Sequence, residues 1–165
     1  MIDSGTEQLV EKYATKGIIV DTNLLLLLFV GSTNRERIQR FSRTEKFTPS
    51  DYDVLGNFLY IFSKIIVTPN ILTEVNSMLN QLKDPERIQC ARLFGQLISD
   101  YDEQYVVSQE VSRQESFVKF GLTDCGIMNV AKDQYLVLTD DFKLSLYLQS
   151  MGIDVINFNH IRILN

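Results

Sequence analysis

The sequence predicts an α/β protein in which helices alternate with the strands of a mostly parallel sheet. Residues 18–20 (IIV) are apolar without alternation, as expected of a strand buried on both faces of a parallel sheet. The segments 64–67 (KIIV) and 135–138 (YLVL) are also expected to be strands, and each is followed by a predicted helix. Strands separated by helices pair in parallel through right-handed crossovers.

The first half of the chain contains one well-marked helix start. Thr68-Pro69-Asn70 offers a threonine cap and a proline in the first turn, and apolar residues then recur at helical spacing from Ile71 to Leu82. The expected elements are strands at 18–20 and 64–67 and helices at 24–29, 54–62 and 71–82, with a polar, basic segment at 32–53.

The second half continues the alternation of helices and strands. Pro85 starts or interrupts a helical stretch, and Thr123 is expected to cap a helix that runs past Ala131. Gly121 and Gly152 are placed to end helices. The expected elements are helices at 86–99, 110–120, 123–131 and 142–151, strands at 105–107, 135–138 and 153–158, and a turn at 139–141.

Length and charge limit the classes of function. We expect one domain over residues 1–165, with a longer polar and helical segment at about 31–63. A chain of this length can bury roughly 70% of its unfolded surface, so a core is available. A net charge of −5 does not suggest a general nucleic-acid binder, because phosphate contacts need local positive charge. A basic patch can still act within an acidic chain.

The sequence does not suggest a membrane or secreted protein. The apolar run from Leu24 to Val30 is too short to cross a bilayer, and the residues before it are too mixed in charge for a signal peptide. Cys90 and Cys125 match no metal-binding spacing. We therefore expect reduced thiols in a cytoplasmic protein.

Acidic residues are expected to gather beyond the carboxyl ends of the strands, where parallel sheets place their sites. Asp21 and Asp140-Asp141 directly follow strands, Glu74 lies about two turns into the helix after 64–67, and Asp124 lies in the first turn of its helix. Two carboxylates about 4 Å apart repel by roughly 4 kcal/mol at an effective dielectric constant near 20. Such repulsion raises pKa values or spreads the groups apart.

A hard divalent cation would remove this conflict. Mg²⁺ and Mn²⁺ prefer carboxylate and water oxygens, and one or two such ions can promote phosphodiester hydrolysis. Each acid also has a structural interpretation. Asp21 could cap the following turn and Glu74 could be a surface residue, whereas Asp124 could interact with a helix dipole and Asp140-Asp141 could be turn residues. Four such coincidences at one sheet edge favour the metal site.

Four motifs, in this order, resemble those of PIN-domain proteins, a family of small metal-dependent nucleases. They are IIVDTN, the early-helix glutamate of PNILTEV, GLTDCGIMNVA with alanine seven residues after its aspartate, and LVLTDDFKL with its Thr-any-Asp pattern. The resemblance spans residues 17 to about 158. It implies a five-stranded parallel sheet between layers of helices, which is a three-layer α/β/α fold.

The resemblance also implies roles for individual residues. Asp21, Glu74, Asp124 and Asp141 would hold Mg²⁺ or Mn²⁺, and Asp140 would support the site or replace Asp141 as the ligand. Asn23 and Thr139 would orient water, phosphate or the carboxylates. The implied activity is endonucleolytic cleavage of RNA, and an antitoxin protein is an expected partner because many small bacterial members are toxins. The segment at 31–63 is longer than in the smallest toxins.

Basic residues after the first helix are candidates for RNA contact. Arg37, Arg40 and Arg43 would form a slowly winding stripe on a helix, flanked by Arg35 and Lys46. Phe41 and Phe47 could stack on unpaired bases or belong to the core. Lys143 could contact phosphate or be a surface residue. His160 is expected to be a surface or packing residue, and the apolar segment 54–62 to be a core helix or a docking surface for a homodimer or an antitoxin.

Four other kinds of protein compete with the ribonuclease. A PIN-like scaffold would bind RNA or a protein without catalysis, although all four acidic positions are filled. A haloacid-dehalogenase-like phosphotransferase needs an acid at the position of Asn23, and a receiver domain needs two acids after the first strand. A structure-specific DNA nuclease would share the metal chemistry but is usually larger.

Overall fold

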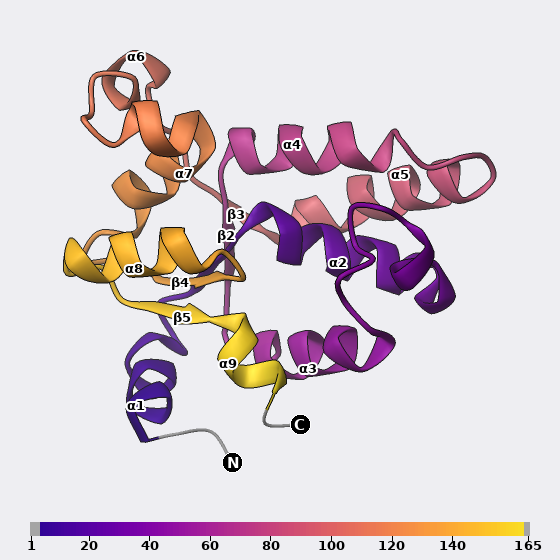
Figure 1. Ribbon diagram of the computed structural model, residues 1–165, viewed down its shortest axis with the longest axis horizontal. Coiled ribbons are helices and arrows are strands. Elements are labelled where there is room, and N and C mark those ends of the chain that lie inside the picture. The colour runs from indigo at the N-terminus through magenta and orange to yellow at the C-terminus, as the bar shows by residue number, and fades with distance from the viewer. Residues whose placement is uncertain (1–3, 164–165) are drawn as a thin grey trace.

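A computed structural model describes residues 4–163 of the chain. Five strands form one all-parallel sheet in the order β3-β2-β1-β4-β5, with helices on both sides, which confirms the predicted three-layer α/β/α fold. In Figure 1, α2, α4 and α5 lie on one side of the sheet and α7 and α8 lie on the other. None of the described helices is long and apolar enough to cross a membrane.

The bounds of the elements follow the predicted alternation. The strands are β1 (Ile18–Val20), β2 (Ile65–Val67), β3 (Asp102–Glu103), β4 (Leu136–Thr139) and β5 (Val155–Asn157). The α-helices are α1 (Ser4–Tyr13), α2 (Thr22–Thr33), α3 (Pro49–Leu59), α4 (Pro69–Leu79), α5 (Glu86–Leu97), α6 (Ser108–Val111), α7 (Phe117–Ala131), α8 (Phe142–Ser150) and α9 (Phe158–Arg162). Two 3₁₀ helices are η1 (Arg35–Arg40) and η2 (Ile98–Asp100).

The central strands and α2 form the middle of the core. Ile18, Ile19 and Val20 are fully buried, as are the leucines from Leu24 to Leu27. Neighbouring helices cover both faces of β1, which explains why its side chains are all apolar and do not alternate. Burial of this kind contributes about 25 cal/mol per Å² of apolar surface removed from water.

Two helices begin with the same local chemistry. Thr68 accepts a hydrogen bond from the Ile71 backbone at 3.3 Å and precedes Pro69, as the sequence predicted for α4. Thr48 and Asp51 form a reciprocal capping box around Pro49, so α3 begins at residue 49. The prediction of a helix over 54–62 was therefore wrong at both ends.

The region between α5 and β4 differs most from the prediction. The strand expected at 105–107 is instead β3, at Asp102–Glu103, where two polar residues pair with the edge of β2. The helix expected over 110–120 is divided between α6 and the start of α7. Gly121 interrupts α7 with φ of +76°, a conformation that favours glycine. Thr123 makes a tertiary contact, described below, instead of the predicted helix cap.

Candidate active site

The register of the sheet brings the strand-end acids together. Val20 of β1 pairs with Leu138 of β4, so Asp21 and Thr139 lie side by side where the two strands end. The Asp21 backbone N–H donates to the Leu138 carbonyl at 3.0 Å, which extends the ladder by one residue. The first turn of α2 and the turn into α8 begin at this edge (Figure 1).

Asp21 is buried and held by two hydrogen bonds. The Thr139 hydroxyl donates to Asp21 Oδ2 at 2.6 Å, and the Thr22 backbone N–H donates to Oδ1 at 2.6 Å. Only 6% of Asp21 is exposed. Burial raises the pKa of Asp21 to about 6, and the charges of Asp140 and Asp141 act in the same direction against these hydrogen bonds. Asp21 thus begins α2 and is also a carboxylate that resists ionisation.

Glu74 is held by two threonine hydroxyls from other elements. Thr22 Oγ1 donates to Glu74 Oε2 at 3.0 Å, and Thr123 Oγ1 donates to Oε1 at 2.6 Å. The carboxylate therefore ties the second turn of α4 to the starts of α2 and of the second part of α7. A glutamate on a freely solvated helix surface would make no such pair of contacts.

Asp124 lies among charges of its own sign. Its carboxylate accepts no hydrogen bond from the residues that the structure describes. Burial, together with the charges of Asp21, Glu74 and Asp141, raises the pKa of Asp124 to about 7. These interactions show that four acids from α2, α4, α7 and α8 share one electrostatic environment.

Asp140 and Asp141 have different surroundings. Asp140 accepts a hydrogen bond from Asn23 Nδ2 at 3.3 Å and forms an ion pair with Lys46 through its other oxygen. Asp141 caps α8, with Oδ1 accepting from the backbone N–H groups of Lys143 and Leu144 at 2.7 and 3.0 Å. Asp141 is therefore a residue of the turn before α8, as its structural interpretation held, and its Oδ2 accepts no hydrogen bond from the described residues.

The basic residues after α2 do not form the predicted helical stripe. Of this basic segment, residues 35–40 form the short 3₁₀ helix η1. The segment from Phe41 to Phe47 then turns back toward the acidic edge, where Lys46 pairs with Asp140. Phe41 and Phe47 are 7% and 0% exposed, so they pack in the core and are not available to stack on bases. Arg35 pairs with Asp53.

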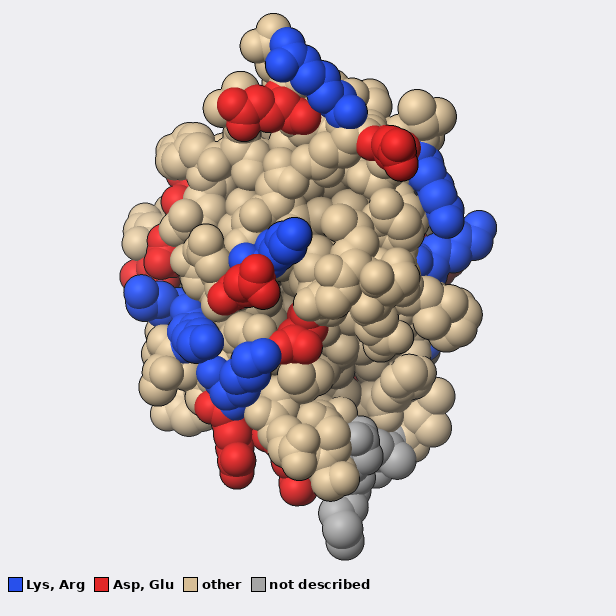
Figure 2. Space-filling model, turned by 90° about the vertical axis from the view of Figure 1, so that its left-hand side faces the viewer, with Lys and Arg blue, Asp and Glu red and all other residues tan. Residues whose placement is uncertain are grey.

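Of the other residues singled out from the sequence, Lys143 and His160 are exposed and the two cysteines are buried. Lys143 is exposed at the start of α8. His160 is exposed on α9, as expected. Cys90 and Cys125 are buried and form no disulfide. Figure 2 shows the side of the molecule bearing α7 and α8, where basic and acidic side chains lie next to one another around a broad uncharged area.

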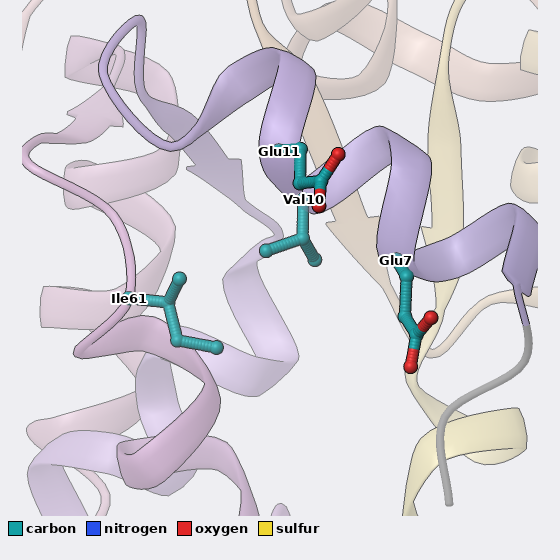
Figure 3. A pocket seen from close by; sticks show the side chains of 4 residues that line it. All are labelled: Glu7, Val10, Glu11 and Ile61. Carbon is teal, nitrogen blue, oxygen red and sulfur yellow. The ribbon is translucent and has the colours of Figure 1, made fainter.

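The segment 54–62 is mostly part of the core. Leu55, Phe58 and Phe62 are buried, so only Tyr60 and Ile61 of the apolar residues in the expected docking surface are largely exposed. Ile61 lines a hollow of about 290 Å³ with α1. Figure 3 shows Val10 and Ile61 on its two sides, while the carboxylates of Glu7 and Glu11 point away from Ile61. This hollow contains none of the predicted site residues.

Three contacts at the acidic edge were not predicted from sequence. Thr22 and Thr123 bind Glu74, and Lys46 pairs with Asp140. Each threonine is the immediate neighbour of a predicted acid, which is the signal that could have identified it. Lys46 carries no comparable signal, because its position depends on how the segment after η1 folds back.

The residues at this edge fit a hard divalent cation in their chemistry. Within residues 4–163, no group of three or more His, Cys, Asp or Glu side chains is already arranged to hold a metal ion. The donors available are carboxylate oxygens, which Mg²⁺ and Mn²⁺ prefer. Burial and neighbouring acids raise the pKa values of Asp21 and Asp124, and a cation would favour their ionised forms.

Comparisons with known proteins do not assign the chain to a family. No model of a known protein family matches it, and no functionally characterised protein matches its sequence.

Proposed function

We propose that this protein is an endoribonuclease that hydrolyses phosphodiester bonds with Mg²⁺ or Mn²⁺. The observation that carries the proposal is the shared environment of Asp21, Glu74, Asp124 and Asp141 at the carboxyl edge of a parallel sheet. Structural carboxylates are normally paired with cations or hydrogen-bond donors. Asp21 is buried and Asp124 is half-buried, and neither forms an ion pair with a described residue, so this edge of the sheet is a candidate for a functional site.

The four carboxylates share one task in this proposal. Asp21, Glu74, Asp124 and Asp141 would hold the ion, with Asp124 and Oδ2 of Asp141 offering oxygens that accept no protein hydrogen bond. A bound divalent cation would polarise the scissile phosphate and lower the pKa of an attacking water.

Hydroxyl groups would keep the carboxylates in place. Thr139 fixes Asp21, and Thr22 and Thr123 fix Glu74, so these carboxylates lose little freedom when an ion binds. Asp140 is compensated by Lys46 and Asn23, which favours Asp141 over Asp140 as the direct ligand.

RNA is the proposed substrate because the four acidic motifs resemble those of PIN-domain ribonucleases. The acids expected from that resemblance are the ones that share this environment in the fold. Cleavage within a strand fits an open edge of a sheet, where a chain can pass across the carboxylates.

The experiment is cleavage of labelled single-stranded RNAs and DNAs in Mn²⁺, Mg²⁺ and EDTA. Wild type should cut RNA only with a divalent metal. Asp21→Asn should lower the rate at least about 100-fold, because even indirect supports of metal ligands contribute 10- to 100-fold. The matched control is Asp154→Asn, which alters an aspartate at the opposite edge of the sheet and should leave the rate unchanged.

Calorimetry with Mn²⁺ separates this function from a non-catalytic scaffold. The scaffold would bind RNA or a protein partner without hydrolysing phosphodiester bonds. Metal-dependent cutting that disappears in Asp21→Asn supports the nuclease. No heat of metal binding and no cutting of any substrate would refute it and leave the carboxylates a structural role.

A further inference from the structure

A basic pocket lies at the far end of α4 from Glu74. It has a volume of about 380 Å³, and its polar lining comes from Arg37, Arg40, Ser42, Gln81 and Lys83. Phe41 and Leu82 form its apolar floor and are almost fully buried. The pocket thus combines three cations with a hydroxyl and an amide on a rigid base.

The cations of this pocket are only partly compensated. Arg37 pairs with Glu86, and the charges of Arg37 and Arg40 help to lower the pKa of that carboxyl, with the Arg37 hydrogen bond as the largest cause. Among the described residues, Arg40 and Lys83 form no ion pair. An anion with several oxygens would use these donors, and phosphate is the group that arginine and lysine bind together most readily.

The pocket is connected to the acidic edge by residues 41–48, here called the connecting segment. At one end, Arg43 Nε donates to Gln81 at 3.0 Å, beside the pocket. Near the other end, Lys46 pairs with Asp140 at the carboxylates. Phe47 is fully buried and Arg162 donates to the Lys46 carbonyl at 3.2 Å, so the segment is anchored along its length.

The separation suits a single strand that occupies both places. Leu79, the last residue of α4, lies five residues after Glu74, which corresponds to about 7.5 Å along the helix axis, and Gln81 follows in the next turn of the chain. A strand whose scissile phosphate lies at the carboxylates would reach the pocket with a phosphate a few nucleotides away. Of the cations of the connecting segment, Arg43 lies beside the pocket and Lys46 lies at the carboxylates.

We propose that this pocket binds a backbone phosphate of single-stranded RNA, away from the bond that is cut. The inference rests on the proposed ribonuclease function. An RNA strand is favoured over an acidic protein because the connecting segment joins the pocket to the carboxylates. The side in Figure 2 has its charges mixed, whereas the pocket concentrates cations.

The test is RNA binding by the full chain, measured by fluorescence anisotropy in EDTA so that no cutting occurs. The ligand is a labelled single-stranded RNA of about twelve nucleotides, within the range that single-strand binders cover. The pocket variant is Arg40→Ala/Lys83→Ala. The control variant is Lys16→Ala/Lys132→Ala, whose exposed lysines precede β1 and β4 at the opposite edge of the sheet.

We expect the pocket variant to bind RNA about tenfold more weakly, with a salt-dependence slope smaller by roughly 0.7, as the loss of one phosphate contact requires. The control should change affinity less than about twofold. Equal losses in both variants, or no loss in either, would overturn the proposal.

Two further arms identify other ligands. Inorganic phosphate that binds in calorimetry and is lost in the pocket variant, with RNA affinity unchanged, would make this a site for a free anion. A polyglutamate peptide that binds as tightly as RNA and is weakened equally would indicate an acidic protein. Either result would overturn the RNA assignment.

The outcomes for the pocket and for catalysis are separable. RNA binding that depends on the pocket, in a protein that cuts nothing with Mn²⁺, would refute the nuclease and keep the phosphate site. Metal-dependent cutting with the same RNA affinity in wild type and the pocket variant would support the nuclease and refute the phosphate site.

Discussion

The two edges of the sheet treat their carboxylates in opposite ways. At the amino edge, Asp154 directly precedes β5 and accepts hydrogen bonds from Lys12 Nζ at 2.6 Å and the Tyr13 hydroxyl at 2.8 Å. Burial acts to raise the pKa of Asp154, but these two donors outweigh it and the pKa is lowered. At the carboxyl edge, burial and neighbouring acids raise the pKa of Asp21 and Asp124.

This difference distinguishes a carboxylate that stabilises the fold through its own contacts from carboxylates whose charges the fold leaves without a cation. Asp154 ties the end of α1 to β5, and its charge is compensated within the chain. Asp21 accepts two hydrogen bonds but forms no ion pair with a described residue. Asp124 has neither a donor nor a cation among the described residues, and other acids lie near both side chains. Only the second arrangement leaves a net requirement for positive charge, which an external ion can satisfy.

The largest effect that sharpens the comparison is the dependence of stability on pH. Asp21 has a folded-state pKa of about 6 and an ordinary value of 3.8, so the folded state holds its proton more tightly. Its contribution to stability is therefore lost as pH rises from about 4 to 7. Each unit of difference is worth about 1.4 kcal/mol, so the metal-free protein should lose about 3 kcal/mol through Asp21 alone.

Urea unfolding of the EDTA-treated protein at pH 5 and pH 8 measures about half of this loss, roughly 1.4 kcal/mol, because the remainder has already occurred below pH 5. Asp21→Asn should flatten the profile, and Mn²⁺ should restore stability to wild type at pH 8 by binding the folded state. Asp154 has the opposite sign, since its lowered pKa gives stability that is lost only as pH falls below its ordinary value of 3.8. Equal stability of wild type at pH 5 and pH 8 would contradict the buried, uncompensated state of Asp21.

A smaller effect is expected from the hydroxyl that holds Glu74. Thr123→Val keeps the shape of the side chain and removes the donor at 2.6 Å from Oε1. We expect Mn²⁺ affinity to fall about 10- to 100-fold, because groups that orient metal ligands contribute that much. The measurement is calorimetric titration, with Thr33→Val as control, since that hydroxyl donates to the Phe29 carbonyl within α2. Equal affinities in wild type and Thr123→Val would show that Glu74 needs no such support.

The smallest effect should come from the amino edge. Lys12 is exposed, and exposed ion pairs contribute little to stability. Lys12→Ala should shift the melting temperature by no more than about 2 °C, and it should leave RNA cleavage unchanged. Circular dichroism melts and the cleavage panel check both points. A large loss of cleavage would break the distinction between the two edges.

Local sequence signals predicted most of the fold and the acids of the site. The apolar runs of β1, β2 and β4 and the Thr-Pro start of α4 are properties of a few adjacent residues. The same signal at Thr48-Pro49 marks the true start of α3, so that error was avoidable. The strand at Asp102–Glu103 was not predictable by pattern, because an edge strand of two polar residues resembles a loop.

The sequence by itself determined the α/β alternation and the placing of five acids at or near the starts of helices beyond the sheet. Only the tertiary structure decided that Thr22 and Thr123 bind Glu74 and that Lys46 meets Asp140, across 52, 49 and 94 residues of sequence. It also decided that Phe41 and Phe47 belong to the core. The physical reason is that periodicity and capping act within one or two turns, whereas charge compensation depends on which helix ends the sheet brings together.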